Sequence, residues 1–356
     1  MGPAAAGGEA PEGARRATLR ARRRAAASPS AGAEGAEARL AAAWAAARRI
    51  VVFSGSGMSA SAGMSTFSTR GGLYDRARRR FGLRGDGVEL FTFGFFERRP
   101  ADCRALLADV FLEALRAKPT ASHRALGEAE RAGRLRRHYT LNIDGLHAAE
   151  GLGLGTWCPH DAPDAVTAQL HGSVRQAVCP ACTLARPMDR KVAREWREGV
   201  PVPCMACGGE TRPRVMLYGD GHSEAVTPNE ILDLLEDDMA DADLVLWVGL
   251  SFKQSASVEY FRQALRHLRS AGRENDVPLV VLNPDAEALW NLRTACTNTD
   301  SLPLFQVEAA SDDVLPALVG RPGLDAENEA EPSHKTGAKD RGADGGGAEG
   351  RKRPKR

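Results

Sequence analysis

The sequence predicts an α/β fold built on a doubly wound parallel sheet. Short apolar runs end in small or polar residues and are followed by helical segments, and this order recurs along the chain. Uninterrupted apolar runs are typical of strands buried in parallel sheets. The polar residues at the strand ends should meet along one edge of the sheet, where α/β folds bind ligands. They are Ser54, Asn142, Asp144, His171, Ser251 and Asn283.

Composition sets the size and class of the protein. Its 356 residues, 43% of them hydrophobic, can form one large domain or two smaller ones. A net charge of +2 gives no reason to expect direct nucleic-acid binding by the core. No apolar run approaches the roughly 18 residues of a membrane span, so we expect no membrane association. Residues 1–38 and 321–356 are rich in Ala, Gly and charged residues, so we expect both segments to be disordered.

The two ends of the chain point to different compartments. Closely spaced arginines near the N-terminus resemble an organellar transit peptide, but the glutamates among them count against that interpretation. Residues 351–356 read RKRPKR, which resembles a nuclear-localisation signal, and a solvated tail is the alternative. We expect a nuclear protein, with a cytoplasmic or organellar location as the alternative.

The first predicted strand, Ile50 to Phe53, follows a helix expected from Ala36 to Arg49 and runs into small residues. Backbone N–H groups at such a strand-to-helix turn suit a pyrophosphate, and Gly55 and Gly57 let a ligand approach the backbone. The spacing is G-x-G-x5-G rather than G-x-G-x-x-G, and no acidic residue follows at a strand end about 20 positions on. An ordinary tight turn is therefore the alternative to a nucleotide loop.

Two further strand ends carry chemically useful side chains. The alternation from His138 to Gly145 predicts a strand with Asn142 and Asp144 on one face, and an Asx-rich turn is the alternative. The strand expected from Val166 to Leu170 leads directly to His171. A histidine at a strand end can act as a general base near neutral pH, although a lone histidine is more often structural.

Four cysteines form two C-x-x-C pairs separated by 21 residues. This spacing is typical of a structural zinc site, in which each pair brings two thiolates together from one tight turn. Four thiolates leave no coordination position open, so the zinc should hold structure and not activate water. The predicted ligands are Cys179, Cys182, Cys204 and Cys207.

The remaining segments complete the alternating pattern. Residues 81–137 read as mostly helical, and their phenylalanine cluster is typical of core packing. Strands are expected from Arg212, over Leu244–Val248, from Val277 to Asn283 and over Leu304–Val307, with helices between and after them.

Taken together, these stretches resemble the sirtuin family of NAD-dependent protein-lysine deacylases over about residues 40–320. GSGMSASAG resembles the family's GAGxSxxxG loop, YTLNIDGLH its YTQNIDGLH segment, and LHGS its catalytic-histidine motif. VGLS and LNP resemble its ribose-binding elements. The resemblance implies a Rossmann-like catalytic domain over residues 39–320. Its smaller lobe would combine a zinc ribbon, about 176–212, with a helical insertion, about 76–125.

The resemblance also implies the reaction and its participants. NAD would be the co-substrate, one Zn²⁺ would be structural, and an acyl-lysine protein would lose its acyl group to ADP-ribose as nicotinamide leaves. His171 would be the general base, with Asn142 and Asp144 shaping the nicotinamide pocket. The implied NAD contacts are Gly55, Ser56, Gly57, Ser59, Gly63, Phe67, Arg70, Tyr74, Ile143, Gly249, Ser251 and Asn283.

The resemblance is weakest just after the glycine loop. The family's GIPDFR is replaced by GMSTFS, so that Pro becomes Ser65, Asp becomes Thr66 and Arg becomes Ser68, while the family's Gln is Leu141. Losing a guanidinium beside a pyrophosphate removes a contact worth about 1.5–3 kcal/mol. A second function therefore stays open: an NAD- or ADP-ribose-binding regulatory protein with weak or no deacylase activity. A third candidate function is mono-ADP-ribosyl transfer.

We predict that Arg70, two positions beyond Ser68, reaches back to replace the missing guanidinium. Replacing Arg70 by Ala should then slow NAD turnover on the order of ten- to a hundredfold in a nicotinamide-release assay. An unchanged rate would exclude this role for Arg70.

Overall fold

The computed structural model describes residues 31–66, 71–82, 87–221 and 223–320. The predicted disordered tail over 321–356, the basic cluster at its end and most of the predicted disordered segment 1–38 lie outside these residues. Among the described helices, none combines the length and apolar character that crossing a bilayer would need.

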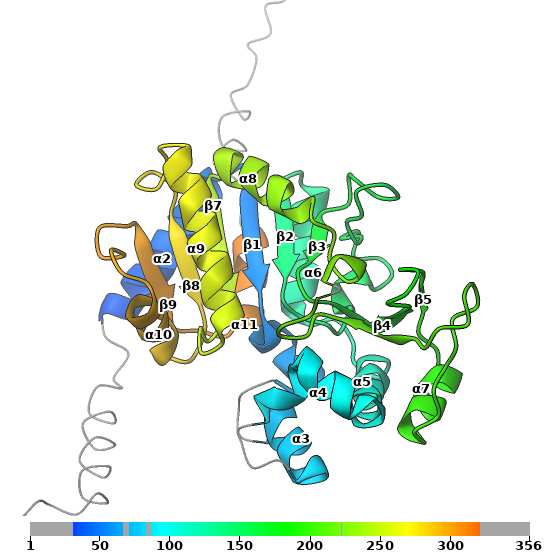
Figure 1. Ribbon diagram of the computed structural model, residues 1–356. Coiled ribbons are helices and arrows are strands. Elements are labelled where there is room, and N and C mark those ends of the chain that lie inside the picture. Colours follow the sequence, from blue (N-terminus) through cyan, green and yellow to red (C-terminus); the bar gives the residue numbers. More distant parts are fainter. Residues whose placement is uncertain (1–30, 67–70, 83–86, 222, 321–356) are drawn as a thin grey trace, which may run out of the picture. The chain divides into compact units, whose positions relative to one another are not determined.

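Within the described residues, six parallel strands form the central sheet, which confirms the predicted doubly wound fold (Figure 1). The order is β3-β2-β1-β7-β8-β9, so the chain winds outward in both directions from the β1–β7 pair. At such a switch point the loops at the carboxyl ends diverge and leave a crevice. The strands are β1 Ile50–Ser54, β2 Leu135–Thr140, β3 Thr167–Gln169, β7 Leu244–Val248, β8 Leu279–Leu282 and β9 Leu304–Val307.

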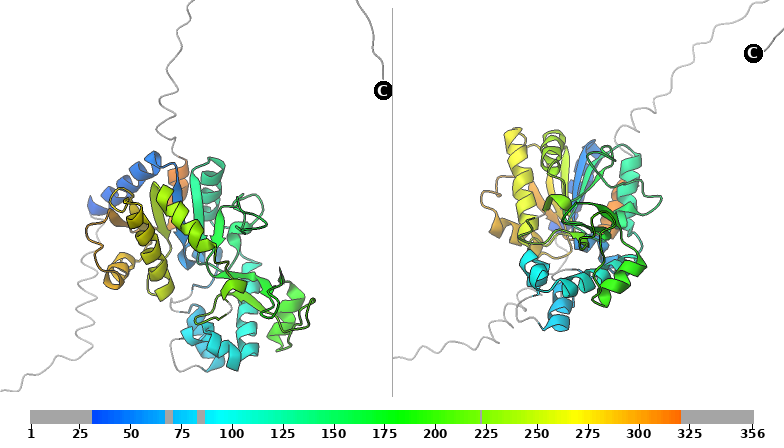
Figure 2. Two further views of the ribbon diagram at one scale, coloured as in Figure 1. Left: turned by 45° about the horizontal axis from the view of Figure 1, so that its top comes forward. Right: turned by 45° about the vertical axis from the view of Figure 1, so that its right-hand side comes forward.

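Helices cover both faces of this sheet, which is why its strands are apolar throughout (Figure 2). On one face, Val51 and Phe53 pack with side chains of α8, α9 and α10, and Phe53 stacks on Trp247 with ring centroids 4.0 Å apart. On the other face, Ile50 and Val52 pack with α2, α6 and α11. The helices are α2 Ala31–Ala46, α6 Ala121–Arg131, α8 Ile231–Asp241, α9 Ser255–Ser270, α10 Glu287–Ala295 and α11 Ser311–Val319.

A second core joins the predicted helical insertion to the three antiparallel strands that flank the cysteine pairs. In the described residues, three antiparallel strands in the order β5-β4-β6 pack against α5 and α7, and the phenylalanine cluster contributes to this core as predicted. The elements are α3 Leu73–Phe81, α4 Phe93–Arg98, α5 Pro100–Ala114, β4 Gly172–Val178, β5 Ala185–Pro187, α7 Arg190–Arg197 and β6 Arg212–Val215. Short 3₁₀ helices are η1 Ser56–Ala62, η2 Val88–Phe91, η3 Leu146–Ala148 and η4 Ser223–Ala225.

Several element boundaries differ from the prediction. The first helix spans Ala31–Ala46 rather than Ala36 to Arg49, and the glycine stretch forms a 3₁₀ helix. Strand β2 ends at Thr140, so the prediction of a strand reaching Gly145 is wrong. The Thr140 hydroxyl accepts a hydrogen bond from the Asn142 N–H at 3.1 Å, and such a local bond competes with continued strand pairing.

A buried ionic cluster ties β2 to α8. The Asp238 carboxylate is fully buried and accepts hydrogen bonds from Arg137 Nε at 2.8 Å and from the Tyr139 hydroxyl at 2.7 Å. Arg136 Nε lies 2.8 Å from its other oxygen. Breaking such a pair leaves a buried charge without compensation.

We predict that Asp238→Asn lowers the free energy of unfolding by about 3 kcal/mol, because the buried Arg137 guanidinium would lose its counter-charge. Urea unfolding followed by circular dichroism measures this change. The exposed neighbour Asp237→Asn is the matched control and should change stability by less than about 0.5 kcal/mol. Equal stability of the two variants would contradict the role given to the cluster.

Candidate functional site

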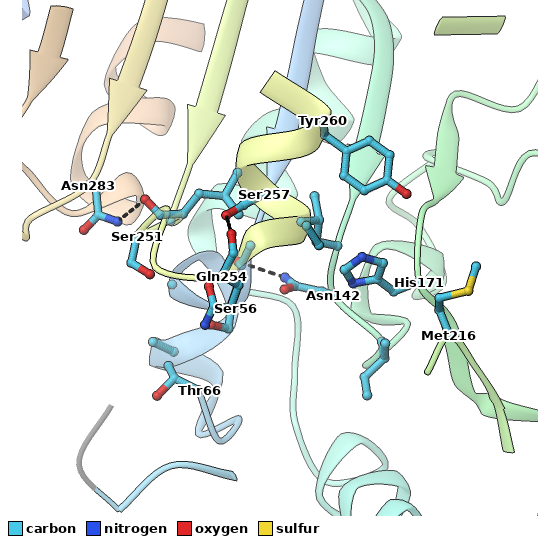
Figure 3. Close-up of a pocket in the computed structure, with 18 of the residues that line it drawn as sticks. Ser56, Thr66, Asn142, His171, Met216, Ser251, Gln254, Ser257, Tyr260 and Asn283 are labelled. Atoms are coloured by element: carbon cyan, nitrogen blue, oxygen red, sulfur yellow. Dashed lines mark hydrogen bonds between the residues drawn. The ribbon is translucent and has the colours of Figure 1, made fainter. Parts of the chain in front are cut away.

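A cavity of about 820 Å³ lies at the carboxyl ends of the central strands (Figure 3). This is the size of a ligand pocket for a small molecule or cofactor, and its place at the switch point is where α/β folds bind nucleotides. Ten of the predicted site residues line it: Gly55, Ser56, Gly57, Tyr74, Asn142, Ile143, His171, Gly249, Ser251 and Asn283.

The glycine loop is held by backbone contact with the loop after β7. The N–H of Gly55 donates to the Val248 carbonyl at 2.9 Å, and that of Gly57 to the Gly249 carbonyl at 3.0 Å. A Cβ on Gly57 would lie 2.7 Å from the Gly249 Cα, so no larger residue fits there. These two glycines therefore bring two loops into contact, and their N–H groups bond to protein rather than point freely into the cavity.

Asn142 joins a third loop to this pair. Its side-chain Nδ2 donates to the Gly55 carbonyl at 3.0 Å and lies 3.2 Å from the Ser59 hydroxyl oxygen. Ser59 is buried behind the cavity wall and does not line the cavity. Gly63 also lies outside the lining; it ends η1 in the left-handed conformation, with φ of 79°.

Asp144 does not line the cavity. Its Oδ1 accepts a hydrogen bond from the Leu146 N–H at 2.9 Å, the geometry of an Asx turn, which was the alternative interpretation of this stretch. Arg175 Nε donates to the Asp144 backbone carbonyl at 2.8 Å, and this bond helps to fix the turn. The structure thus brings Asn142 and Ile143 to the cavity but not Asp144.

His171 lies between β3 and β4 and lines the cavity beside Tyr260, with ring centroids 6.1 Å apart (Figure 3). The Met216 N–H donates to the His171 carbonyl at 3.0 Å and fixes the backbone at this position. Burial lowers the pKa of His171 to about 4, and a hydrogen bond to the Leu141 backbone opposes the shift. The imidazole is therefore neutral at physiological pH and can accept a proton.

Asn283 and Ser251 lie at the other end of the cavity, after β8 and β7. Asn283 Nδ2 donates to the Leu250 carbonyl at 2.8 Å, and its Oδ1 accepts from the Asp285 N–H at 2.9 Å. Asn291 Nδ2 donates to the Ser251 carbonyl at 3.0 Å, so both loops are held rigidly.

The divergent segment after the glycine loop is described only in part. Thr66 lines the cavity, and the Ser65 hydroxyl bonds to Glu113 and Arg76 instead, which form an ion pair. Phe67, Ser68 and Arg70 lie outside the described residues, so the predicted contacts of Phe67 and Arg70 remain predictions.

The sequence did not indicate several cavity residues, because they come from helices and from the loops after β6 and β8. Two of them, Gln254 and Ser257, could have been predicted, because the helix that follows Ser251 begins with polar residues. The residues are Met216, Tyr218, Gln254, Ser257, Tyr260, Asp285 and Asp312.

The four predicted metal ligands do come together. Their Sγ atoms all lie within 4.8 Å of one another, with 3.5 Å between Cys179 and Cys207 and 3.6 Å between Cys182 and Cys204. A tetrahedral zinc site with Zn–S bonds of about 2.3 Å separates its sulfur atoms by about 3.8 Å. The donor set and its geometry fit structural zinc.

A model of the Sir2 family matches residues 55–256, which include the glycine loop, Asn142, His171 and all four cysteines. The chain belongs to the Sir2 family. Its relatives include NAD-dependent protein deacylase 2 of Pseudomonas aeruginosa, which is 32% identical over 229 residues, or 64% of this chain and 79% of the relative. An NAD-dependent histone deacetylase of Saccharomyces cerevisiae is 30% identical over 230 residues, or 58% of this chain and 60% of the relative.

Solved Sir2 structures share the fold. The crystal structure of a Sir2 homologue in complex with NAD superimposes with a TM-score of 0.57 at 22% identity, and the match covers 79% of this chain and 91% of that one. At this identity the likeness concerns the arrangement of helices and strands.

We predict that the purified Sir2-family chain contains one zinc ion, measured by elemental analysis. Cys182→Ser should reduce the zinc content and lower the melting temperature by at least about 5 °C, because metal binding contributes directly to folding. Cys158→Ser removes a thiol outside the cluster and is the control. Full zinc content in Cys182→Ser would contradict the assignment.

Proposed function

We propose that this Sir2-family protein is an NAD-dependent protein-lysine deacylase that transfers the acyl group to ADP-ribose and releases nicotinamide. The observation that carries the proposal is the cavity at the switch point, which is lined by a neutral His171, by the glycine loop and by Asn142 bonded to that loop. The relatives are named as NAD-dependent deacylases and deacetylases, and these activities support the proposal.

NAD would lie along the carboxyl edge of the sheet. Ser251 and Asn283, which line one end of the cavity, would bind the adenosine-side ribose, and Gly55, Ser56 and Gly57 would lie beside the phosphates. The nicotinamide half would extend toward Asn142 and Ile143. Because the N–H groups of Gly55 and Gly57 already bond to the loop after β7, the phosphates need further donors, and Arg70 is the one we propose.

The chemistry would use NAD as an electrophile. The acyl-lysine carbonyl oxygen forms a bond to the ribose carbon as the bond to nicotinamide breaks, and no oxidation or reduction takes place. Neutral His171 then removes a proton from a ribose hydroxyl, whose oxygen attacks the former carbonyl carbon. Hydrolysis of this intermediate gives free lysine and O-acyl-ADP-ribose.

Two observations favour the second candidate, an NAD- or ADP-ribose-binding regulatory protein with little turnover. Asp144 is engaged in an Asx turn and does not line the cavity, so it is not placed to accept from the carboxamide. Leu141 is apolar and packs in the core where the family has Gln. Both bear on catalysis more than on binding.

The substrate would be an acyl-lysine protein, and the four-cysteine module would bind a structural zinc ion.

We propose a nuclear location from the basic cluster over 351–356, which lies outside the described residues. Deleting these six residues from a fluorescent fusion should release it to the cytoplasm, and unchanged nuclear fluorescence would refute this proposal.

We predict that nicotinamide release from NAD requires an acetyl-lysine peptide, because the acyl oxygen is the nucleophile. His171→Ala should lower the rate at least about a hundredfold, the usual contribution of a positioned general base. Binding of ADP-ribose, measured by calorimetry, should persist in this variant. Binding without peptide-dependent release in the unmodified protein would select the regulatory function.

The pH profile should also be unusual for a histidine base. Since burial lowers the pKa of His171 to about 4, the base form persists as the pH falls from 7. We expect kcat/KM to decline only below about pH 5, and not near the ordinary histidine value of about 6.5. A decline centred near pH 6.5 would contradict the environment assigned to His171.

A further inference from the structure

The cavity offers few hydrogen-bond donors to an anionic ligand. In the described part of the chain, its lining includes four carboxylates and no lysine or arginine. The N–H groups of Gly55 and Gly57 bond to carbonyls of the β7 strand end and the loop after it. A pyrophosphate in this cavity therefore needs neutral side-chain donors besides Arg70, the cation proposed for it. The carboxylates are those of Asp220, Glu259, Asp285 and Asp312.

Several polar side chains of the lining already donate to protein atoms. Asn142 and Asn283 donate through Nδ2 to backbone carbonyls, at 3.0 Å and 2.8 Å. The Ser61 hydroxyl donates to the Asp312 carboxylate. These groups are committed to holding the loops, so a ligand competes with the protein for them.

On the glycine loop and the loop after β7, three hydrogen-bonding side chains of the lining have no partner within the described residues. They are those of Ser56, Ser251 and Gln254. Ser56 belongs to the loop proposed for the phosphates, and Ser251 to the end proposed for the adenosine-side ribose. Gln254 is the one of the three that has no role in the NAD site proposed above.

The backbone of Gln254 is fixed while its side chain is free. Gln254 is the N-cap residue of α9, and its side chain makes no capping hydrogen bond. The Ser257 hydroxyl donates to the Gln254 carbonyl at 2.8 Å. The loop that ends at Gln254 contacts the glycine loop through the bond from the Gly57 N–H to the Gly249 carbonyl. The side chain thus lines the same cavity as Ser56 (Figure 3).

We propose that the side-chain amide of Gln254 donates to the pyrophosphate of the bound dinucleotide. The inference rests on the proposed NAD site. An amide Nε2 carries two N–H donors, and hydrogen bonds to a charged acceptor are stronger than those between neutral groups. Because the amide carries no charge, the carboxylates of the wall do not capture it as they would capture a cation. It replaces in part the guanidinium that the sequence lacks at Ser68.

Calorimetry on the full chain, with ADP-ribose and ADP as ligands, tests this role without depending on turnover. Gln254→Leu removes the hydrogen-bonding atoms and keeps most of the side-chain volume. It should raise the Kd of both ligands about tenfold, because both contain the pyrophosphate.

Gln263→Leu is the matched control. It makes the same change on the same helix, at a side chain that also lines the cavity but whose Nε2 donates to Glu259 Oε1 at 3.4 Å. It should leave both Kd values within about twofold. An equal loss of affinity in the two variants would show a general effect of cavity polarity and overturn the inference.

Gln254→Lys separates a ligand contact from a structural role. It restores a donor and adds a positive charge, so it should bind ADP-ribose at least as tightly as the unmodified protein. Its Kd should also depend more steeply on ionic strength between about 0.05 M and about 0.5 M, because salt screens charges. A Lys variant as weak as the Leu variant would overturn the contact. Gln254→Ala replaces Gln254→Leu if thermal unfolding shows that the Leu variant is not folded.

The remaining outcomes are distinct. If Gln254→Leu weakens ADP-ribose but not ADP, the amide contacts the second ribose and the pyrophosphate assignment is overturned. If neither Kd changes, the inference is overturned and the nucleotide site stands. If the unmodified protein binds neither ligand, the proposed NAD site is overturned and the inference fails with it.

Discussion

The close approach of two backbone loops is the constraint on which the site depends. Gly57 and Gly249 touch so closely that a Cβ on either would lie within 3 Å of the other loop's backbone. Hydrogen bonds from the N–H groups of Gly55 and Gly57 to the carbonyls of Val248 and Gly249 hold the two loops together. The glycines are therefore needed to bring the β1 and β7 loops together, and the cavity exists because these loops meet at the switch point of the sheet.

Polar side chains then secure the glycine loop from behind. Asn142 donates to the Gly55 carbonyl. Thr120, at the start of α6, donates from its hydroxyl to the Met58 carbonyl at a distance of 3.1 Å. Asp312, at the start of α11, accepts from Ser122 and Ser61 and so joins two helices to η1. Satisfied networks of this kind make a short loop rigid enough to position a ligand.

The apolar runs, the small or polar residues that end them and the cysteine spacing were enough to predict the sheet, the cysteine cluster and most of the cavity wall. Apolar runs ending at Ser54 and Val248 mark strands directly, and two C-x-x-C pairs specify their own convergence. Asp144 shows where this reasoning stops. Its place in an alternating pattern suggested a strand face, but the strand ends at Thr140, which accepts from the Asn142 N–H, and Asp144 accepts from the Leu146 N–H in a turn.

By itself, the sequence determined the fold class, the metal ligands and the strand ends that carry Asn142, His171 and Asn283, because local periodicity and ligand spacing are properties of short segments. Only the tertiary structure decided which of these side chains face the cavity. It also decided that Tyr260 lies beside His171, that the pKa of His171 is low, and that Asp285 lines the cavity together with Asn283. Burial, helix rotation and charge balance depend on neighbours remote in the chain, and no local pattern encodes them.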